Sequence, residues 1–400
     1  MALITTALLT ALSALTENSS GKQVQITTDF ESRARFERRI DRDFISSAHD
    51  NRSELLWRVR PGATFKTDDW TARIQFQYAN SLIWTQAKNF STENVDATLA
   101  YFQFGTGNGK VTVGRQKINL GDERLIGTLE WSNLSRSMDG IRYQNGTWDA
   151  FAFEFGVAPN IPTDAKIFAV SNKNNAGTTS YILKTDDTPG GDVTVHTLDH
   201  VWKGKVADKI SAEFETAVQT GEVGSKDLDA YAAHFQADYA ASPNLSIGME
   251  FNIASGGQSA THTKTFDNLY PTNHKFYGAA DLQGWRNMQE LSFHIGYKTD
   301  PNGSLSLAWH QFWLFDKTDG WYGAGGGVNP RPGGTYSDPT GASGREIGSE
   351  IDLTYNRKLD SQSSLSFGIA WFEPGSFIKN LNTGQDRRQV WGYGMVSYKF

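Results

Sequence analysis

The strongest constraint on this 400-residue chain is a repeated unit of about ten residues in which apolar and polar side chains alternate. Alternation with period two puts successive side chains on opposite faces of a β-strand, so each run predicts a strand with one apolar and one polar face. The unit recurs from Gln23 to the C-terminus, and its clearest examples are residues 70–78, 210–218, 245–253, 291–297 and 347–355.

The connections between these runs alternate between short and long. The short ones are residues 67–69, 105–109, 144–146, 205–208, 242–244, 299–303 and 358–363, and the long ones are 41–51, 118–137, 255–286, 315–344 and 373–388. Short periplasmic turns alternating with longer extracellular loops are typical of an all-β, antiparallel transmembrane β-barrel. Counts from both ends agree on about 18 strands if 165–171 and 178–186 each supply one, and on 16 otherwise.

Composition excludes several other classes. The chain has 24 Phe, 14 Tyr and 12 Trp but a mean hydropathy of −0.48, and beyond residue 15 it lacks the ~20-residue apolar run of a membrane helix. It has no cysteine, so disulfides and thiolate chemistry are excluded. A net charge of −6 argues against a nucleic-acid partner, and no cofactor is expected.

Both ends of the chain suggest an outer-membrane protein. Residues 2–15 are apolar and have the length of a signal-peptide core, so 1–21 are expected to be a signal peptide or disordered N-terminus before a single barrel domain, 22–400. The last run, 389–400, ends on Phe400, which is typical of proteins handled by the outer-membrane assembly machinery. We therefore expect an integral barrel in contact with outer-membrane lipid.

On a barrel strand the apolar set faces lipid and the polar set faces the lumen. One side of the lumen is then predicted to be rich in arginine, with Arg33, Arg35, Arg58, Arg60, Arg73, Arg115 and Arg142 pointing inward. The later strands point carboxylates and other polar groups inward, namely Glu213, Glu215, His234, Gln236, Asp238, Glu250, His294, Lys298, Glu350 and Asp352. These charges either pair and simply line a wet wall, or leave unpaired arginines as an electropositive path for an anionic solute.

Two longer motifs carry a family resemblance. Residues 114–133 read GRQKINLGDERLIGTLEWSN and are followed by Arg136 and by MDGIR at 138–142, and residues 266–287 form a second motif. Both resemble the alginate-export family of outer-membrane porins, in the same order along the chain, with weaker matches at 213–219 and 350–352. Met138 departs from the family pattern, which has an aromatic residue there.

The resemblance implies an 18-stranded monomeric barrel, with an arginine-lined conduit for alginate or related oligouronates and with periplasmic export partners. It implies that the motif arginines sit at or near a constriction, namely Arg115, Arg124, Arg136 and Arg142. It also implies that Asp122, Glu123 and Glu130 pair with them or anchor a loop. A second loop, folding over or into the pore, would carry Asp267, Asn273, His274, Lys275, Asp281 and Arg286.

Three functions remain open at this stage. The first is a channel for an anionic poly- or oligosaccharide, in either direction, and the second is a general or other-substrate porin. The third is a barrel-fold enzyme, because Glu213 and Glu215 lie two apart on one strand, a spacing of ~7 Å that is compatible with an inverting glycosidase. An acidic lumen wall is the favoured interpretation of that pair. No metal site is predicted, because the eight His, including His196 and His200, lack ligand spacing with a carboxylate.

Overall fold

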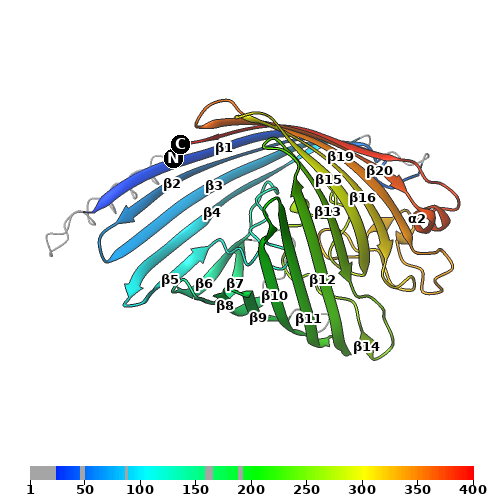
Figure 1. Cartoon of the computed structure of the whole chain (residues 1–400), viewed down its shortest axis with the longest axis horizontal. Coiled ribbons are helices and arrows are strands. Elements are labelled where there is room, and N and C mark those ends of the chain that lie inside the picture. Colours follow the sequence, from blue (N-terminus) through cyan, green and yellow to red (C-terminus); the bar gives the residue numbers. More distant parts are fainter. Residues whose placement is uncertain (1–23, 46–49, 86–88, 158–164, 188–191) are drawn as a thin grey trace.

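The chain forms a closed antiparallel β-barrel in this computed structural model, which describes residues 24–45, 50–85, 89–157, 165–187 and 192–400. Each wall strand pairs with its neighbour along the chain, and β1 also pairs with the last strand, which closes the ring (Figure 1). The eighteen wall strands are β1 (Gln25–Ile40), β2 (Arg52–Lys66), β3 (Trp70–Thr85), β4 (Asn89–Thr106), β5 (Gly109–Gln116), β6 (Ser137–Gln144), β7 (Trp148–Val157), β8 (Lys166–Asn174), β9 (Gly177–Asp186), β10 (Val193–Ala207), β11 (Ile210–Val223), β12 (Lys226–Ala240), β13 (Leu245–Ala254), β15 (Met288–Asp300), β16 (Gly303–Leu314), β19 (Glu346–Lys358), β20 (Ser363–Pro374) and β21 (Gln389–Lys399).

The predicted fold class and the count of eighteen strands are confirmed, because the weak middle stretch supplies β8 and β9. The remaining elements are short: β14 (His262–Thr263), which pairs in parallel with the start of β12, and, outside the barrel sheet, η1 (Asn273–Lys275), β17 (Pro330–Arg331), β18 (Gly334–Thr335) and α2 (Ser376–Leu381). No helix in the described ranges is long and apolar enough to cross a membrane. The expected signal peptide lies outside the described residues.

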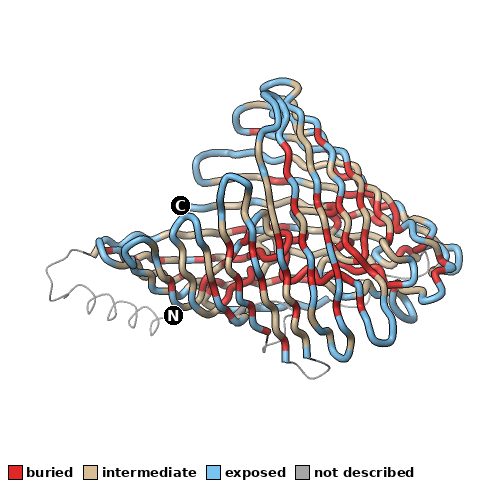
Figure 2. Tube along the Cα trace, turned by 60° about the horizontal axis from the view of Figure 1, so that its bottom comes forward, coloured by how far each residue is buried: buried red, intermediate tan, exposed pale blue. Residues whose placement is uncertain are grey.

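The two faces of the wall are inverted relative to a soluble protein. Large apolar side chains are exposed on the outside, among them Phe102, Ile141, Leu198, Val218 and Phe293. Buried positions gather in the body of the barrel and include many charged and polar side chains, whereas the hairpin tips at the rims are exposed (Figure 2). A contiguous apolar outer surface around a polar interior is what a lipid-facing barrel requires.

Three long connections fold into the interior instead of standing above it. We call them loop A (residues 117–136), loop B (255–287) and loop C (315–345). Loops A and B pair as short backbone segments: Gly127 N donates to Tyr270 O at 2.9 Å, and Tyr270 N donates to Leu125 O at 2.8 Å. A Cβ atom on Gly127 would clash with Thr272, so this close approach of the loops requires a glycine. The joined loops form the buried core inside the barrel.

The outer face generates a prediction about stability. Val218 lies near the middle of β11 and is 53% exposed, so Val218→Arg would place a charge in the lipid-facing band. We expect it to lower the free energy of unfolding in phospholipid vesicles by about 2–4 kcal/mol, measured by urea titration. Glu222→Arg, near the rim of the same strand, should cost no more than about 1 kcal/mol. Equal effects of the two substitutions would contradict a lipid-facing band at Val218.

Candidate channel constriction

Loop A crosses the lumen and is held to the wall by arginines of β1 and β2. Arg33 donates three hydrogen bonds to loop carbonyls, to Glu130 O at 2.8 Å, Trp131 O at 2.9 Å and Ser132 O at 3.0 Å. Arg58, its direct cross-strand neighbour, donates to Glu130 O and Ser132 O at 3.0 and 2.9 Å. Two arginines facing each other across a strand pair repel. The loop carbonyls offset this repulsion, because each satisfies a buried guanidinium N–H.

The side chain of Glu130 adds ion pairs to the same contact. Its carboxylate lies 2.6 Å from both Arg60 and Lys117 and 3.0 Å from Arg58. Burial opposes ionisation of Glu130, but the neighbouring cations outweigh it and lower the pKa of its carboxyl to about 2. The carboxylate therefore stays ionised across the physiological range.

Trp131 ties loop A to loop B and to the wall. Its ring stacks on the imidazole of His274 with centroids 3.7 Å apart, and the Arg35 guanidinium lies 3.9 Å from its centroid. Tyr393 of β21 meets the same ring edge-on at 4.9 Å. A cation, an imidazole and a phenol around one indole fix its position from three directions.

The opposite end of loop A is anchored by Arg124, which is 2% exposed. Its guanidinium lies 2.9 Å from both Asp122 and Glu250 and donates to the Tyr277 hydroxyl at 3.1 Å. The Phe276 ring lies 4.0 Å from the guanidinium carbon. Loop A therefore spans from the arginine-rich β1–β2 side to the carboxylate-rich β11–β13 side.

Arg136 holds the seam between loops A and B without a carboxylate partner among the described residues. It donates to Gly127 O at 2.7 Å, to Pro271 O at 3.3 Å and to Tyr270 O. Burial lowers the pKa of Arg136 to about 10, so the guanidinium remains protonated at neutral pH. A carbonyl satisfies an N–H but does not cancel a charge, so Arg136 contributes a positive field inside the barrel.

Loop B is held by carboxylates of β19. Ala279 N donates to Asp352 at 2.9 Å, and Ala280 N donates to Glu350 at 2.8 Å. His310 lies 2.6 Å from Glu290 and 3.4 Å from Asp352. Glu350 and Asp352 are thus on the inner face but serve as anchors for the loop backbone.

A cavity of about 770 Å³ lies between the three loops and strands β1 to β4 and β9. Lys184 in its lining pairs with Asp267 at 2.7 Å. Arg286 lies 4.7 Å above the Tyr322 ring and has no carboxylate within ion-pair distance in the described part of the chain. The other charged groups in the lining are Arg35, Arg136, Glu37, Glu54, Glu93, Asp186 and Asp281.

The other motif residues of loops A and B act within the plug. Glu123 lies 3.5 Å from Lys275, whose side chain is half exposed. Asn273 donates to Ala324 O of loop C, and His274 lies 2.7 Å from Asp281. The loop that was expected to fold over or into the pore lies in the barrel interior, but Lys275 points to an exposed position rather than to the cavity lining.

Two predicted lumen arginines lie away from the loops. Arg73 on β3 pairs with Asp29 on β1, and Arg142 pairs with Asp149 on the inner face. Arg142 lies close to the end of β6, beside the short turn that joins β6 to β7, so it is near the rim that carries the short turns. Arg142 was expected at or near the constriction with the other motif arginines, and this placement at the short-turn rim differs from that expectation.

Arg115 was expected to face the lumen, and the strand register puts it on the outer face instead. Arg115 lies two residues after Val113 on β5, so the two side chains share a face. Its partner on β6, Asp139, lies two residues before Ile141 and shares the face of that residue. Val113 and Ile141 are both nearly half exposed, which marks this as the outer face. Arg115 contacts Asp139 at 2.7 Å and Asp96 at 2.9 Å. Strand β5 ends at Gln116 while β4 continues, so Arg115 also donates to Ala97 O on the uncovered edge of β4, at 3.1 Å.

Several residues that shape the site were missed from the sequence. Lys117, Trp131 and Tyr270 lie inside the motifs that carried the resemblance, so their position in a motif was the available signal. Asp199, Glu290 and His310 belong to ordinary alternating strands, and no local pattern separates them from other inward polar residues.

Comparisons with known proteins agree with this architecture. The family model described as alginate export matches residues 24–392. Among solved structures, the barrel resembles three porins of Pseudomonas aeruginosa. OccK5 (OpdH) matches with a TM-score of 0.61 and 11% sequence identity, over 94% of this chain and 98% of that chain. The outer membrane protein OprD matches with a TM-score of 0.62 and 10% identity, over 94% of this chain and 93% of that chain. OccK2 (OpdF) in complex with glucuronate matches with a TM-score of 0.60 and 11% identity, over 94% of this chain and 98% of that chain. No curated protein sequence matches the chain.

A closed eighteen-stranded barrel with an apolar outer band and inward loops defines the class of outer-membrane channel proteins. Within that class, this chain belongs to the alginate-export family. The family and the structural neighbours are channels rather than enzymes.

The anchoring of loop A predicts an effect of removing Arg33. Arg33→Gln deletes three of the six side-chain hydrogen bonds that reach the backbone carbonyls of residues 130–132, and hydrogen bonds from charged donors contribute about 1.5–3 kcal/mol each. We expect hydrogen–deuterium exchange across 128–132 to accelerate at least about tenfold. Arg142→Gln, which removes an inner arginine near the other rim, should leave that exchange unchanged. A similar acceleration in both variants would contradict the proposed tether.

The low pKa of Glu130 predicts how loop A responds to acid. The folded protein favours the ionised form of Glu130. The contribution of this carboxylate to the stability of the folded loop is therefore complete above its ordinary pKa of about 4.5 and is lost as the pH falls toward 2. Single-channel current noise should therefore rise between pH 4.5 and 2 in the wild type. Glu130→Gln should be noisy already at pH 7, whereas Glu123→Gln in the same loop should behave as wild type. If the Glu130→Gln channel showed wild-type current noise at pH 7, the Glu130 carboxylate would not be what holds loop A in place.

Proposed function

We propose that this channel conducts anionic oligo- or polysaccharides, with alginate or related oligouronates as the substrate class. The observation that carries the proposal is the set of guanidinium groups whose charge is not cancelled. Arg33 and Arg136 are held by backbone carbonyls, and Arg286 lies over an aromatic ring, with no carboxylate partner for any of the three among the described residues. Guanidinium groups suit uronates because their planar fork matches a carboxylate.

The charges around the loop A contact support the proposal. The cations on the β1–β2 side outnumber the carboxylates they touch by five to three. The cations are Arg33, Arg35, Arg58, Arg60 and Lys117, and the carboxylates are Glu31, Glu37 and Glu130. An excess of positive charge beside a constriction favours anions in a pore.

The family assignment and one structural neighbour add further support. Alginate is a polyuronate, and OccK2 (OpdF), a barrel of the same fold, has been solved in complex with glucuronate. At 11% identity that neighbour supports only the ability of such a scaffold to hold a uronate. The proposal includes a single barrel as the working unit, periplasmic export partners, assembly through the C-terminal strand, and transport in either direction.

A second candidate is a general porin of weak selectivity. The 770 Å³ cavity is lined by more carboxylates than cations, and a positive β1–β2 side facing a carboxylate-rich β11–β13 side makes a transverse field that acts on any dipolar solute. This arrangement would admit polar solutes without demanding a net anionic charge.

Bilayer electrophysiology separates the two candidates. We expect the wild type to prefer anions, from its reversal potential in a salt gradient, and to be blocked by short oligouronates. Arg286→Gln should lower the anion preference about two- to fivefold and weaken the block, because it removes an uncompensated charge from the cavity. Arg38→Gln, an exposed outward position of β1, should change neither. Unselective conductance without block would favour the general porin.

A further inference from the structure

The rim of the wall that carries the long loops drops abruptly between β4 and β5. Strand β4 has 18 residues and β5 has 8, and their pairing runs from the Ala100–Arg115 pair to the Thr106–Gly109 pair. Residues 89–99 continue beyond the last pair for roughly 30 Å, at about 3.3 Å per residue, and among the described strands only β3 pairs with them. Figure 1 shows the long strands β1 to β4 beside the short strands β5 to β9. One edge of β4 therefore lies free of a neighbouring strand beyond the end of β5.

Side chains take the place of a strand at the base of this free edge. Arg115 donates to Ala97 O at 3.1 Å, and the Ser137 hydroxyl donates to Thr98 O at 2.8 Å. An uncovered strand edge presents a row of backbone N–H and C=O groups to whatever lies beside it. Sugar hydroxyls suit such a row, because each hydroxyl both donates and accepts hydrogen bonds.

The 770 Å³ cavity reaches the free edge of β4. Its lining includes Thr92, Glu93 and Asn94, which are consecutive residues of this strand. Successive side chains of a strand point to opposite faces, so a cavity confined to the lumen would contact mainly every second one. Glu93 shares a face with Val95, which is 70% exposed. The cavity therefore extends around the edge of β4 toward the outer side of the wall.

Strand β9 forms the other side of this opening. Lys184 and Asp186, near the end of β9, line the same cavity, whereas none of its described lining residues comes from β5, β6, β7 or β8. Those four strands have 8 to 10 residues each, close to the about 9–11 that cross a bilayer. The wall between β4 and β9 is therefore low where the cavity lies.

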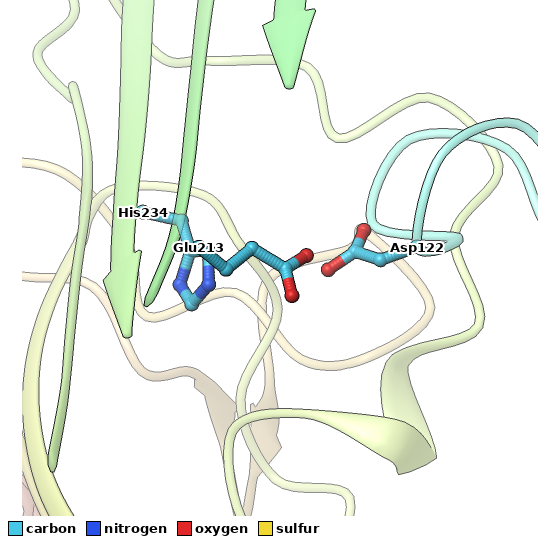
Figure 3. A group of neighbouring side chains, drawn as sticks. All are labelled: Asp122, Glu213 and His234. Atoms are coloured by element: carbon cyan, nitrogen blue, oxygen red, sulfur yellow. The ribbon is translucent and has the colours of Figure 1, made fainter. Parts of the chain in front are cut away.

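Charged groups deeper in the interior are held by one another. In the group shown in Figure 3, Asp122 pairs with a guanidinium of loop A at 2.9 Å and Glu213 pairs with Lys203 at 2.5 Å. Both ring nitrogens of His234 also have partners. In the cavity beside β4, by contrast, Arg286 has no carboxylate within ion-pair distance in the described part of the chain. An anionic ligand therefore meets an uncompensated charge in this cavity.

We infer that the cavity opens sideways between β4 and β9, and that the conducted saccharide enters or leaves the barrel along the free edge of β4. Backbone groups of residues 92–94 bind sugar hydroxyls there, and Arg286 attracts the carboxylates. The identity of the solute rests on the proposed function, whereas the side opening rests on the strand pairing and the cavity lining alone. The competing route runs through an adjoining cavity of about 470 Å³, which shares Glu37, Glu54 and Asp281 with the first.

Site-directed labelling tests the side opening, because the chain contains no cysteine of its own. Glu93→Cys places a thiol in the opening, and Ser91→Cys places one on the same face of the same strand, exposed but outside the cavity lining. Each channel is measured in a bilayer before and after reaction with a compact neutral maleimide, which separates the bulk of the adduct from the loss of the carboxylate. We expect the adduct at position 93 to weaken the block by short oligouronates at least about threefold, and the adduct at position 91 to leave it unchanged.

Uptake of a neutral disaccharide by proteoliposomes supplies a second readout. The adduct at position 93 should slow this uptake, and the adduct at position 91 should not. If oligouronates fail to block the wild type, the proposed function fails, and the uptake measurement still tests the opening. The heat-dependent shift of folded barrels on denaturing gels shows that each variant is folded.

Three results would overturn the side opening. The first is a folded Glu93→Cys barrel whose thiol does not react with the maleimide. The second is a fully labelled barrel in which both the block and the uptake are unchanged, which would place the route in the adjoining cavity. The third is an equal effect of the adducts at positions 91 and 93, because Ser91 lies outside the cavity lining.

Discussion

The contact between the arginines of β1–β2 and the backbone of loop A is the interaction on which the rest of the interior depends. A loop inside a barrel must satisfy its carbonyl groups without the help of a regular sheet. Arg33 and Arg58 supply the donors, and the loop carbonyls in turn satisfy guanidinium groups that would otherwise be crowded and unpaired. Without the other, the arginines would keep unpaired N–H groups and the loop would keep unpaired carbonyls, so wall and loop stabilise each other.

Because the arginines hold a loop, an arginine-rich wall in this barrel is not an open lining of the pore. A row of inward arginines suggests an open electropositive lining, but here most of their N–H groups are directed at a loop. Their charges persist even where their hydrogen bonds are used, because carbonyls do not neutralise them. The wall therefore acts on a solute mainly through its field, while direct contact falls to residues that face the cavity, such as Arg286.

The same loop joins two sides of opposite charge. Its Glu130 end is bound by cations and its Arg124 end by carboxylates, so the loop is oriented by electrostatics as well as by the Gly127–Tyr270 backbone pairing. Trp131, held between Arg35 and His274, couples loop A to loop B. Trp131, Arg35 and His274 all line the cavity, so the Glu130 end of loop A is in direct contact with the cavity lining.

The sequence by itself determined the barrel, its strand number of about eighteen and the positions of its long connections, because period-two alternation and the lengths of connections are local properties of the chain. The inward fold of residues 266–287 was indicated only by the family resemblance, and that of loop C was not predicted. The sequence also indicated the inner face of regular strands such as β1 and β2. On the short strand β5 the inner face was assigned wrongly, because Arg115 shares a face with the exposed Val113. Only the tertiary structure decided which inward charges are partnered, since Arg33 meets residues nearly one hundred positions away and no local pattern records that contact.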